Sequence, residues 1–230
     1  MNGCVRSLSA MMESLKGIDT DVEIILCPPA IFLGAASVAP VSFGAQDVSA
    51  HDTGAYTGEI SAAQIAETGA KYAIVGHSER RKNWNETSTI VAQKALQAYR
   101  AGLIPIICIG DDIDCDGEIC ADSYSAIEKQ LRTSIPKEFT QHPAKFIIAY
   151  EPVWAIGSGT IPSAADILKM HSHIYNILRD MHIAAPIIYG GSVNAENATE
   201  ISSVPRVDGF LVGRASLITG EFIPIIEATK

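Results

Sequence analysis

The 230-residue sequence lacks the features that mark membrane and exported proteins. No apolar run approaches the roughly 18 residues that span a bilayer, because proline, glycine or a charged residue interrupts each run first. The first residues have neither the basic start nor the continuous apolar stretch of a signal peptide. We therefore expect a protein that makes no membrane contact and is cytoplasmic.

Cysteine and basic residues are also scarce. The 5 cysteines are an odd number without a dense framework, which favours free thiols over disulfides. The 17 basic and 26 acidic side chains give a net charge of −9, and no cluster of lysine and arginine offers a surface for nucleic acid. We expect no nucleic-acid partner, and an anionic ligand needs a local site that works against the overall negative field.

Apolar residues, in contrast, are plentiful at 47% of the chain, which is enough to bury a large core. The length allows one large domain or two small ones. No linker or low-complexity tract divides the sequence, so we expect a single domain over residues 1–230.

Short, nearly all-apolar runs alternate with helical patterns along the chain. Such runs are typical of parallel strands that helices cover. The alternation predicts an α/β protein with right-handed strand–helix–strand units in one sheet, either doubly wound or closed into a barrel. The seven predicted strands are 22–27, 41–45, 72–76, 104–109, 146–150, 186–189 and 209–212.

Glu151 is the first candidate for chemistry, because it directly follows a predicted buried strand. An arbitrary glutamate is more often a helix cap or a salt-bridge partner. Here a proline and a tryptophan follow, then spaced glycines and Ser163 before the next helix, which is typical of a lid that moves on hinges. Glu151 at the root of this lid is a candidate general base.

His77 follows another predicted strand and precedes a predicted helix. A single histidine is more often structural. The positive end of a helix dipole, however, opposes protonation and predicts a neutral ring that can donate a hydrogen bond to a carbonyl. A neutral imidazole beside a carboxylate is the pair needed to move a proton between carbons adjacent to a carbonyl.

Two strand-to-helix turns late in the chain are rich in glycine, one at 190–192 and one at 213–214. Either alone could be ordinary turn chemistry. Two successive turns of this kind in a parallel barrel can aim backbone N–H groups at a phosphate. Together they predict a phosphate site.

Other ligand motifs are absent or incomplete. The stretch 157–162 has no third glycine and ends in proline, so it is not a dinucleotide fingerprint. Asp112, Asp114 and Asp116 begin like a calcium loop, but Ser123 at its twelfth position cannot supply the bidentate carboxylate. We expect no metal site.

Six motifs, in the family's order, resemble the triosephosphate isomerase family over almost the whole chain. The resemblance implies a (β/α)8 TIM barrel that forms a homodimer. It also implies the interconversion of dihydroxyacetone phosphate and glyceraldehyde 3-phosphate, two small phosphorylated sugars, without a metal or organic cofactor. The motifs are 42–47, 54–59, 76–81, 150–157, 189–194 and 208–213.

The resemblance also implies roles by position in these motifs. By this resemblance, Glu151 is expected to be the base, and His77 is expected to act as a neutral ring that polarises the carbonyl and stabilises the enediolate. Glu79 matches a supporting acid beside the site. The residues expected to hold the phosphate are Gly157, Gly191, Ser192, Gly213 and Arg214.

The loop 47–61 corresponds to a segment that enters the partner subunit in this family. Thr57 is expected to reach the partner's site, and Glu59 to be available for pairing with Arg80. A long loop without structure of its own would be unusual unless it bound something.

The sequence departs from the family pattern at Arg214, where glycine is usual. If this position needs a positive φ, arginine costs about 1–2 kcal/mol relative to glycine. Alternatively, its guanidinium adds to the anion site. Asp111 stands where glutamate is common, a shortening that we expect to be tolerated.

The sequence begins Met1-Asn2-Gly3 and enters a helical pattern at once, whereas a closed barrel needs eight strands. In the family, the strand ahead of this motif carries an asparagine and a lysine that neutralises substrate charge. We expect the natural protein to have further N-terminal residues and the chain as given to be severely impaired. An isomerase of a four-carbon sugar phosphate and a barrel protein without catalysis are the alternatives.

Overall fold

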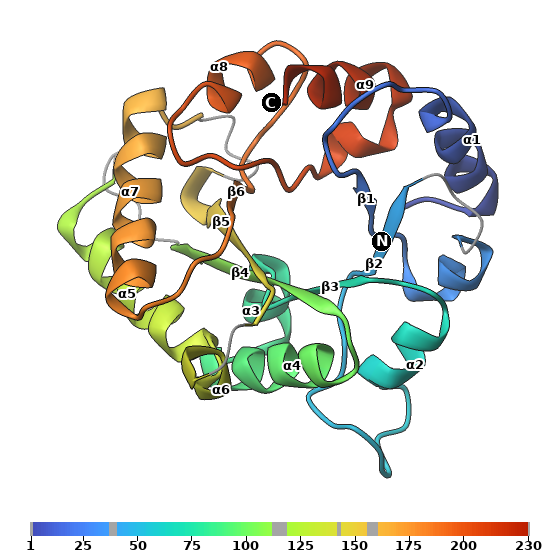
Figure 1. Cartoon of the computed structure of the whole chain (residues 1–230), viewed down its shortest axis with the longest axis horizontal. Helices are drawn as coiled ribbons and strands as arrows, with labels where there is room; N and C mark the ends of the chain where they lie inside the picture. Colours follow the sequence, from blue (N-terminus) through green and yellow to red (C-terminus); the bar gives the residue numbers. More distant parts are fainter. Residues whose placement is uncertain (1, 37–40, 112–118, 142–143, 156–160, 230) are drawn as a thin grey trace.

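The computed structural model describes residues 2–36, 41–111, 119–141, 144–155 and 161–229. Helices surround a curled parallel sheet, which Figure 1 shows end on. The strands pair in sequence order, so each contacts the one before it and the one after it. They are β1 (Ile25–Leu26), β2 (Ser42–Ala45), β3 (Tyr72–Val75), β4 (Ile104–Asp111), β5 (Ile147–Pro152) and β6 (Ile187–Tyr189).

This order decides between the two predicted architectures. A doubly wound sheet reverses its strand order at a switch point, whereas a barrel adds each strand to the same edge. The described strands never reverse, so the fold is the TIM-barrel type. Six of the seven predicted strands are confirmed. The seventh is reduced to one bridge, in which Phe210 pairs with Tyr189 beside β6.

The helices follow the expected alternation, and three of them begin at a serine or threonine that caps the helix. Ser61, Thr87 and Ser163 each accept a hydrogen bond from the backbone N–H three residues on. The helices are α1 (Val5–Leu15), α2 (Ala62–Glu67), α3 (Ser78–Trp84), α4 (Ser88–Arg100), α5 (Ala121–Ser134), α6 (Lys137–Gln141), α7 (Ala164–Asp180), α8 (Ala198–Ser202) and α9 (Thr219–Ala228). Short 3-10 turns are η1 (Ala30–Ala36), η2 (Val153–Ala155) and η3 (Arg214–Leu217).

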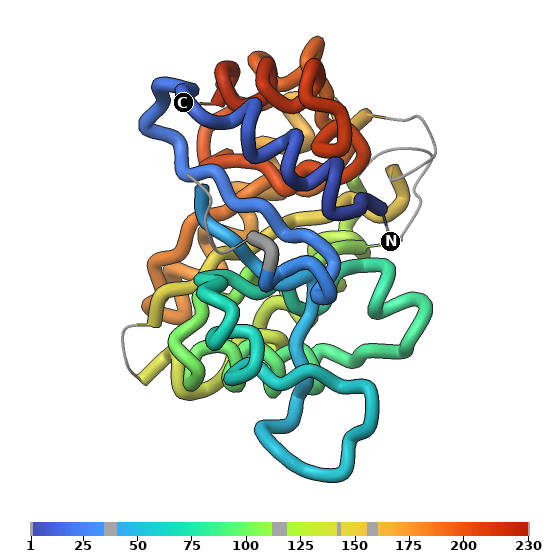
Figure 2. The backbone as a smooth tube through the Cα atoms, turned by 90° about the vertical axis from the view of Figure 1, so that its right-hand side faces the viewer, coloured from blue at the N-terminus to red at the C-terminus, as the bar shows by residue number. Residues whose placement is uncertain are grey.

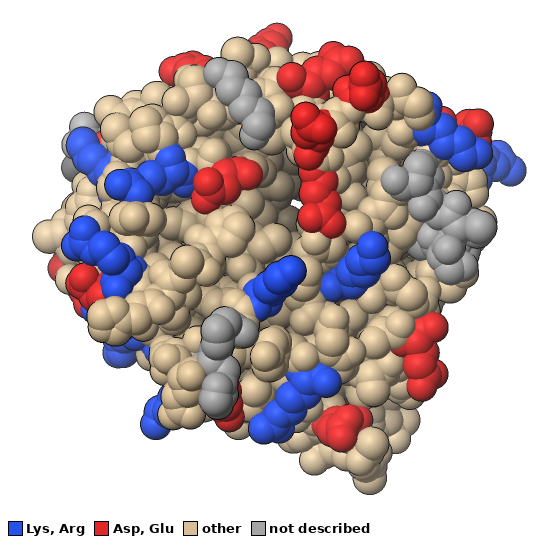
Figure 3. All heavy atoms as spheres, viewed as in Figure 1, with Lys and Arg blue, Asp and Glu red and all other residues tan. Residues whose placement is uncertain are grey.

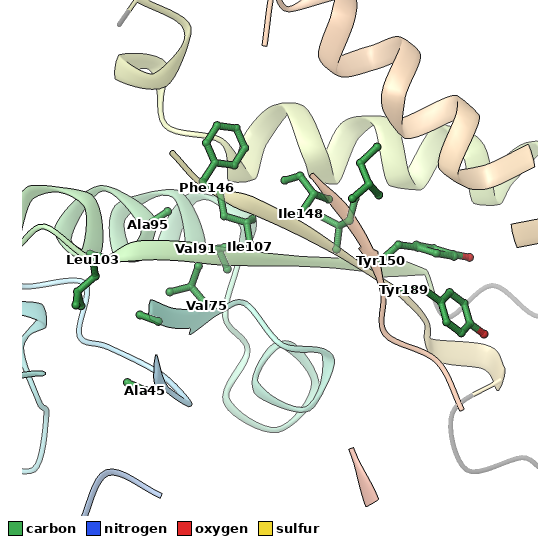
Figure 4. Close-up of a cluster of buried hydrophobic side chains, with 14 of the residues drawn as sticks. Ala45, Val75, Val91, Ala95, Leu103, Ile107, Phe146, Ile148, Tyr150 and Tyr189 are labelled. Carbon is green, nitrogen blue, oxygen red and sulfur yellow. The ribbon is translucent and has the colours of Figure 1, made fainter. Parts of the chain in front are cut away.

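The strands are nearly all apolar because both of their faces are buried. Along β4, Ile106 and Cys108 join a small cluster made mostly of strand residues. Ile107 alternates with them and joins the large cluster between sheet and helices, where Figure 4 shows it beside Val75 and Val91. The period of two along each strand therefore divides the side chains between two apolar layers.

The loop 47–61 projects from the body of the barrel, as Figure 2 shows in light blue. Its ends are joined where the Ser49 N–H donates to the Ile60 carbonyl at 2.8 Å. Within it, the rings of His51 and Tyr56 stack with centroids 3.8 Å apart.

A buried charge network anchors the start of this loop to α3 and α4. The Lys94 ammonium contacts Asp47 at 2.7 Å and Glu86 at 2.5 Å. Arg80 pairs with the same two carboxylates, at 2.9 Å and 2.6 Å. Within this chain Arg80 therefore binds Asp47 and Glu86, and no ion pair in the described residues joins it to Glu59.

The expectation of five free thiols is wrong for Cys120, which is disulfide-bonded. Cys4, Cys27 and Cys108 are free. The odd number and wide spacing of the cysteines argue against a dense disulfide framework, but these features do not exclude an isolated bond.

Acidic and basic side chains are interspersed on the face that Figure 3 shows. No helix in the described part of the chain is long and apolar enough to cross a membrane.

Candidate active site

The ends of three neighbouring strands bring the candidate residues together. His77 follows β3, and Glu151 lies near the end of β5, paired in register with Gly110 of β4. On the other side, the Gly190 N–H donates to the Tyr150 carbonyl at 2.7 Å. Because the strands are parallel, their carboxyl ends share one rim, which is where barrel enzymes place their sites.

The Glu151 carboxylate is only 1% exposed and is held by the start of α3. One oxygen, Oε2, accepts a hydrogen bond from the Ser78 backbone N–H at 2.9 Å. The other, Oε1, lies 3.0 Å from the Ser78 hydroxyl, which donates to it, and 3.0 Å from His77 Nε2. A buried carboxylate needs such donors, and three of them come from two adjacent residues, His77 and Ser78.

Ser78 was not singled out by the sequence patterns. It is the first residue of α3, where a backbone N–H has no partner within the helix. The sequence signal that could have identified Ser78 is its position directly after His77, at a predicted helix start. A residue at this position has a backbone N–H that is free to bind at the site, and serine adds a hydroxyl.

His77 is the N-cap of α3, and its side chain is 31% exposed. Its Nδ1 accepts a hydrogen bond from the Glu79 backbone N–H at 3.3 Å. This places the ring proton of the neutral form on Nε2, which faces Glu151 and can donate to it.

The direction of the His77 pKa differs from the prediction. Burial lowers this pKa, but the hydrogen bond and charge of Glu151, together with the charge of Glu79, outweigh burial and raise it above the ordinary value. The helix dipole alone predicts the opposite. The effect of the helix dipole is outweighed, because a carboxylate 3.0 Å from the ring acts on its pKa more strongly than the end of a seven-residue helix does.

The Cys108 thiol lies below this pair, on β4. Burial, followed by the charge of Glu151, raises its pKa well above the ordinary value. The thiol is therefore protonated at neutral pH and adds no second negative charge beside Glu151.

The first predicted phosphate turn follows β6, and close packing explains its glycines. A Cβ on Gly190 would lie 3.1 Å from Glu151 Cγ, and a Cβ on Gly191 would overlap the Tyr189 hydroxyl. Ser192 is exposed, and its carbonyl accepts a hydrogen bond from Asn197 Nδ2 at 2.9 Å. The glycines are thus needed for close approach, since neither has a positive φ.

The second predicted phosphate turn contains Gly213 and Arg214 at the start of η3. Arg214 is exposed and is not among the residues with positive φ, so the proposed strain cost at this position does not arise. Leu211, three residues earlier, would lie 3.7 Å from a Cβ on Gly190, so the two turns are neighbours.

Part of the expected site cannot be placed. Gly157 and the middle of the predicted lid, residues 156–160, lie outside the described residues. The lid root is described: η2 follows β5 directly, and Ser163 caps α7 on the far side. Glu79 lies in the first turn of α3 with an exposed side chain, and Thr57 is exposed on the projecting loop.

The described residues hold no group of three or more His, Cys, Asp or Glu side chains that could bind a metal ion. The site offers instead a buried carboxylate paired with an imidazole, beside two glycine turns. A barrel with such a pair at the carboxyl ends of its strands belongs to the class of acid–base barrel enzymes.

Comparisons with known proteins narrow this class. The family model of triosephosphate isomerase matches residues 1–229. The triosephosphate isomerase of Psychromonas ingrahamii is 41% identical, over 100% of this chain and 96% of that protein. The one of Acidiphilium cryptum is 40% identical, over 99% and 94%. The crystal structure of the Bartonella henselae enzyme matches with a TM-score of 0.84 and 33% identity, over 99% and 94% of the two chains.

The chain belongs to the triosephosphate isomerase family, and it is an isomerase.

The His77–Glu151 contact predicts how the pKa of His77 responds to substitution. Glu151→Gln removes the negative charge that raises this pKa, while burial, which lowers it, persists. The pKa of His77 should therefore fall, so that the ring loses its proton at lower pH than in the parent. Titration of the imidazole signals by NMR measures this. Glu79→Gln, which removes a smaller raising influence, should give a smaller fall, and an unchanged His77 pKa in Glu151→Gln would contradict the assignment.

Proposed function

We propose that Glu151 and His77 carry the proton transfer in this isomerase. The reaction is the interconversion of dihydroxyacetone phosphate and glyceraldehyde 3-phosphate. One observation carries the proposal: the Glu151 carboxylate and His77 Nε2 lie 3.0 Å apart at the carboxyl rim, so one bound substrate can meet both.

In this proposal Glu151 removes a proton from one substrate carbon and returns it to the neighbouring carbon. His77 donates its Nε2 proton as a hydrogen bond to the substrate oxygen, which stabilises the negative charge that develops there. In the described structure Glu151 is instead bound to Ser78 and His77. Substrate binding must therefore exchange these hydrogen bonds for contacts with the substrate.

The two glycine turns are proposed to bind the substrate phosphate. Gly191 and Ser192 present one segment of backbone, and Gly213 with Arg214 presents the other. Gly157 is proposed to add a third contact. The exposed Arg214 has no ion-pair partner among the described residues, so its charge is available to an anion. Glu79 is proposed as the supporting acid because its charge acts on His77.

The alternatives receive no support from the relatives. Those described above are all triosephosphate isomerases, and they align with nearly the full chain. We therefore favour the three-carbon substrate over a four-carbon one, and an active enzyme over a barrel without catalysis.

Glu151→Gln tests the proposed base, because an amide of almost the same shape cannot accept the proton. The kcat should fall by about 10²–10⁴, the usual contribution of a positioned acid–base group. Steady-state kinetics in both directions measures it. Glu138→Gln, an exposed substitution in α6, is the matched control and should leave kcat unchanged. Turnover of Glu151→Gln within tenfold of the parent, a barrier change below about 1.4 kcal/mol, would refute the role.

We also propose that the protein is a single-domain, cytoplasmic homodimer in which loop 47–61 enters the partner. The loop and the nearby α3 expose large apolar side chains: Tyr56 is 45% exposed, Ile60 38% and Trp84 63%. Such side chains gain from burial in an interface. In the dimer, Thr57 would complete the partner's site. The cytoplasmic location fits a phosphorylated sugar, whose charge prevents it from crossing membranes.

A charge placed on the loop tests the dimer. Tyr56→Asp should shift the protein toward monomer at micromolar concentration and lower activity in parallel, because each site would lose the partner's loop. Sedimentation velocity measures the mass. Leu168→Asp, on an exposed position of α7, is the control and should leave the dimer intact. A parent protein that is a stable monomer at this concentration would contradict the proposal.

A further inference from the structure

Arg81 lies in α3, three residues after Ser78, and joins this helix to β4, α4, α5 and the turn that follows β3. Its Nε donates to the Gly76 carbonyl at 2.8 Å, and its Nη2 donates to the Cys108 carbonyl at 2.9 Å. The remaining bonds go to hydroxyl groups. They are Nη2 to Ser134 Oγ at 3.1 Å and Nη1 to Ser88 Oγ at 3.2 Å.

These bonds span the place where the sheet opens. The β3–β4 pairing ends with Val75 opposite Ile107, and Gly76, with a φ of +70°, then turns the chain away from β4 toward His77. The guanidinium bonds to the carbonyl of Gly76, which directly follows β3, and to the carbonyl of Cys108 within β4. It thus replaces the ladder hydrogen bonds that are lost where the chain leaves the sheet to present His77 and Ser78.

The space beneath this turn is shaped for the guanidinium. A Cβ on Gly76 would lie 2.9 Å from Arg81 Nη2 and 2.6 Å from Val91 Cγ2. The turn can therefore approach the guanidinium this closely only because it has no side chain. His77 follows at once, so its position depends on this packing.

The charge of Arg81 is unusual for a largely buried group. All four of its hydrogen bonds go to uncharged oxygens, and the described residues show no ion pair within 4.0 Å of it. Burial lowers its pKa below the ordinary value, and nearby negative charges, which include Glu151 and Glu86, offset only part of this effect. A buried cation without a contacting anion costs stability, so its retention calls for a reason beyond packing.

The geometry points to a role for Arg81 as a positioning residue for the active site. We propose that it fixes the turn that carries His77 and Ser78 against Glu151, and that its positive charge beneath the site balances the buried carboxylate. Arg81 does not touch the substrate, and it acts through these three residues. This inference rests on the proposed roles of Glu151 and His77.

A double-mutant cycle tests the inference. Arg81→Met removes both the hydrogen bonds and the charge, and Arg81→Lys keeps the charge but cannot form the fork. Each is made in the parent and in Glu151→Gln, with kcat, KM and folded fraction measured for all. Arg132→Met is the control, because Arg132 is exposed on α5 and its one ion pair among the described residues is with Glu128 on the same helix.

In the parent, Arg81→Met should lower kcat at least tenfold with KM changed less than twofold, because the phosphate turns are untouched. Arg81→Lys should recover part of this loss. In the Glu151→Gln background, Arg81→Met should lower kcat by a clearly smaller factor than in the parent, since one of the groups through which Arg81 acts is already gone. Arg132→Met should have no effect in either background.

An equal loss of kcat in both backgrounds would show a purely structural role and overturn the inference, as would a folded Arg81→Met protein with parental kcat. If Arg81→Met does not fold, two other variants are measured in the same double-mutant cycle and judged by the same criteria. They are Arg81→Lys and Ser134→Ala, the second of which removes one of the four hydrogen-bond acceptors of Arg81. High turnover of the Glu151→Gln single variant would instead refute the proposed function. This measurement involves no Arg81 variant, so the two proposals can fail separately.

Discussion

The structure at the rim depends on one requirement, which is to keep the Glu151 carboxylate bound while it is almost fully buried. A carboxylate taken out of water needs hydrogen-bond donors. Both Ser78 donors and His77 Nε2 come from the first residues of one short helix. The orientation of α3 relative to β5 is therefore set by these hydrogen bonds to Glu151 as well as by apolar packing.

Glycines beside Glu151 allow the neighbouring backbone to pack closely against it. Gly110 and Gly190 flank it on the two adjacent strands, and a side chain on either would press against it: a Cβ on Gly110 would lie 3.2 Å from Glu151 Cβ. Beneath it, the Cys108 thiol stays uncharged. The absence of side chains at these two glycines therefore brings the strands' ends close to the carboxylate.

Much of this could be predicted from the sequence, because apolar strands and the polar residues that end them are local signals. The strand order and the meeting of Glu151 with His77 follow from parallel strands sharing one rim. Other features depend on contacts between distant residues. Ser78 and Glu151 are 73 positions apart, and the raised His77 pKa arises from the same approach. The bond at Cys120 was missed because cysteine spacing does not reveal pairing.

The central claim is that a single side-chain base carries the substrate proton, which can exchange with solvent while it is on the enzyme. Isomerisation of glyceraldehyde 3-phosphate in deuterated water, followed by proton NMR, tests it most directly. The account predicts that deuterium enters the product at the carbon that gains the proton, on one face only, because one carboxylate on one side of the substrate delivers it. Product without deuterium, as a direct hydride shift would give, or with deuterium on both faces would contradict the account.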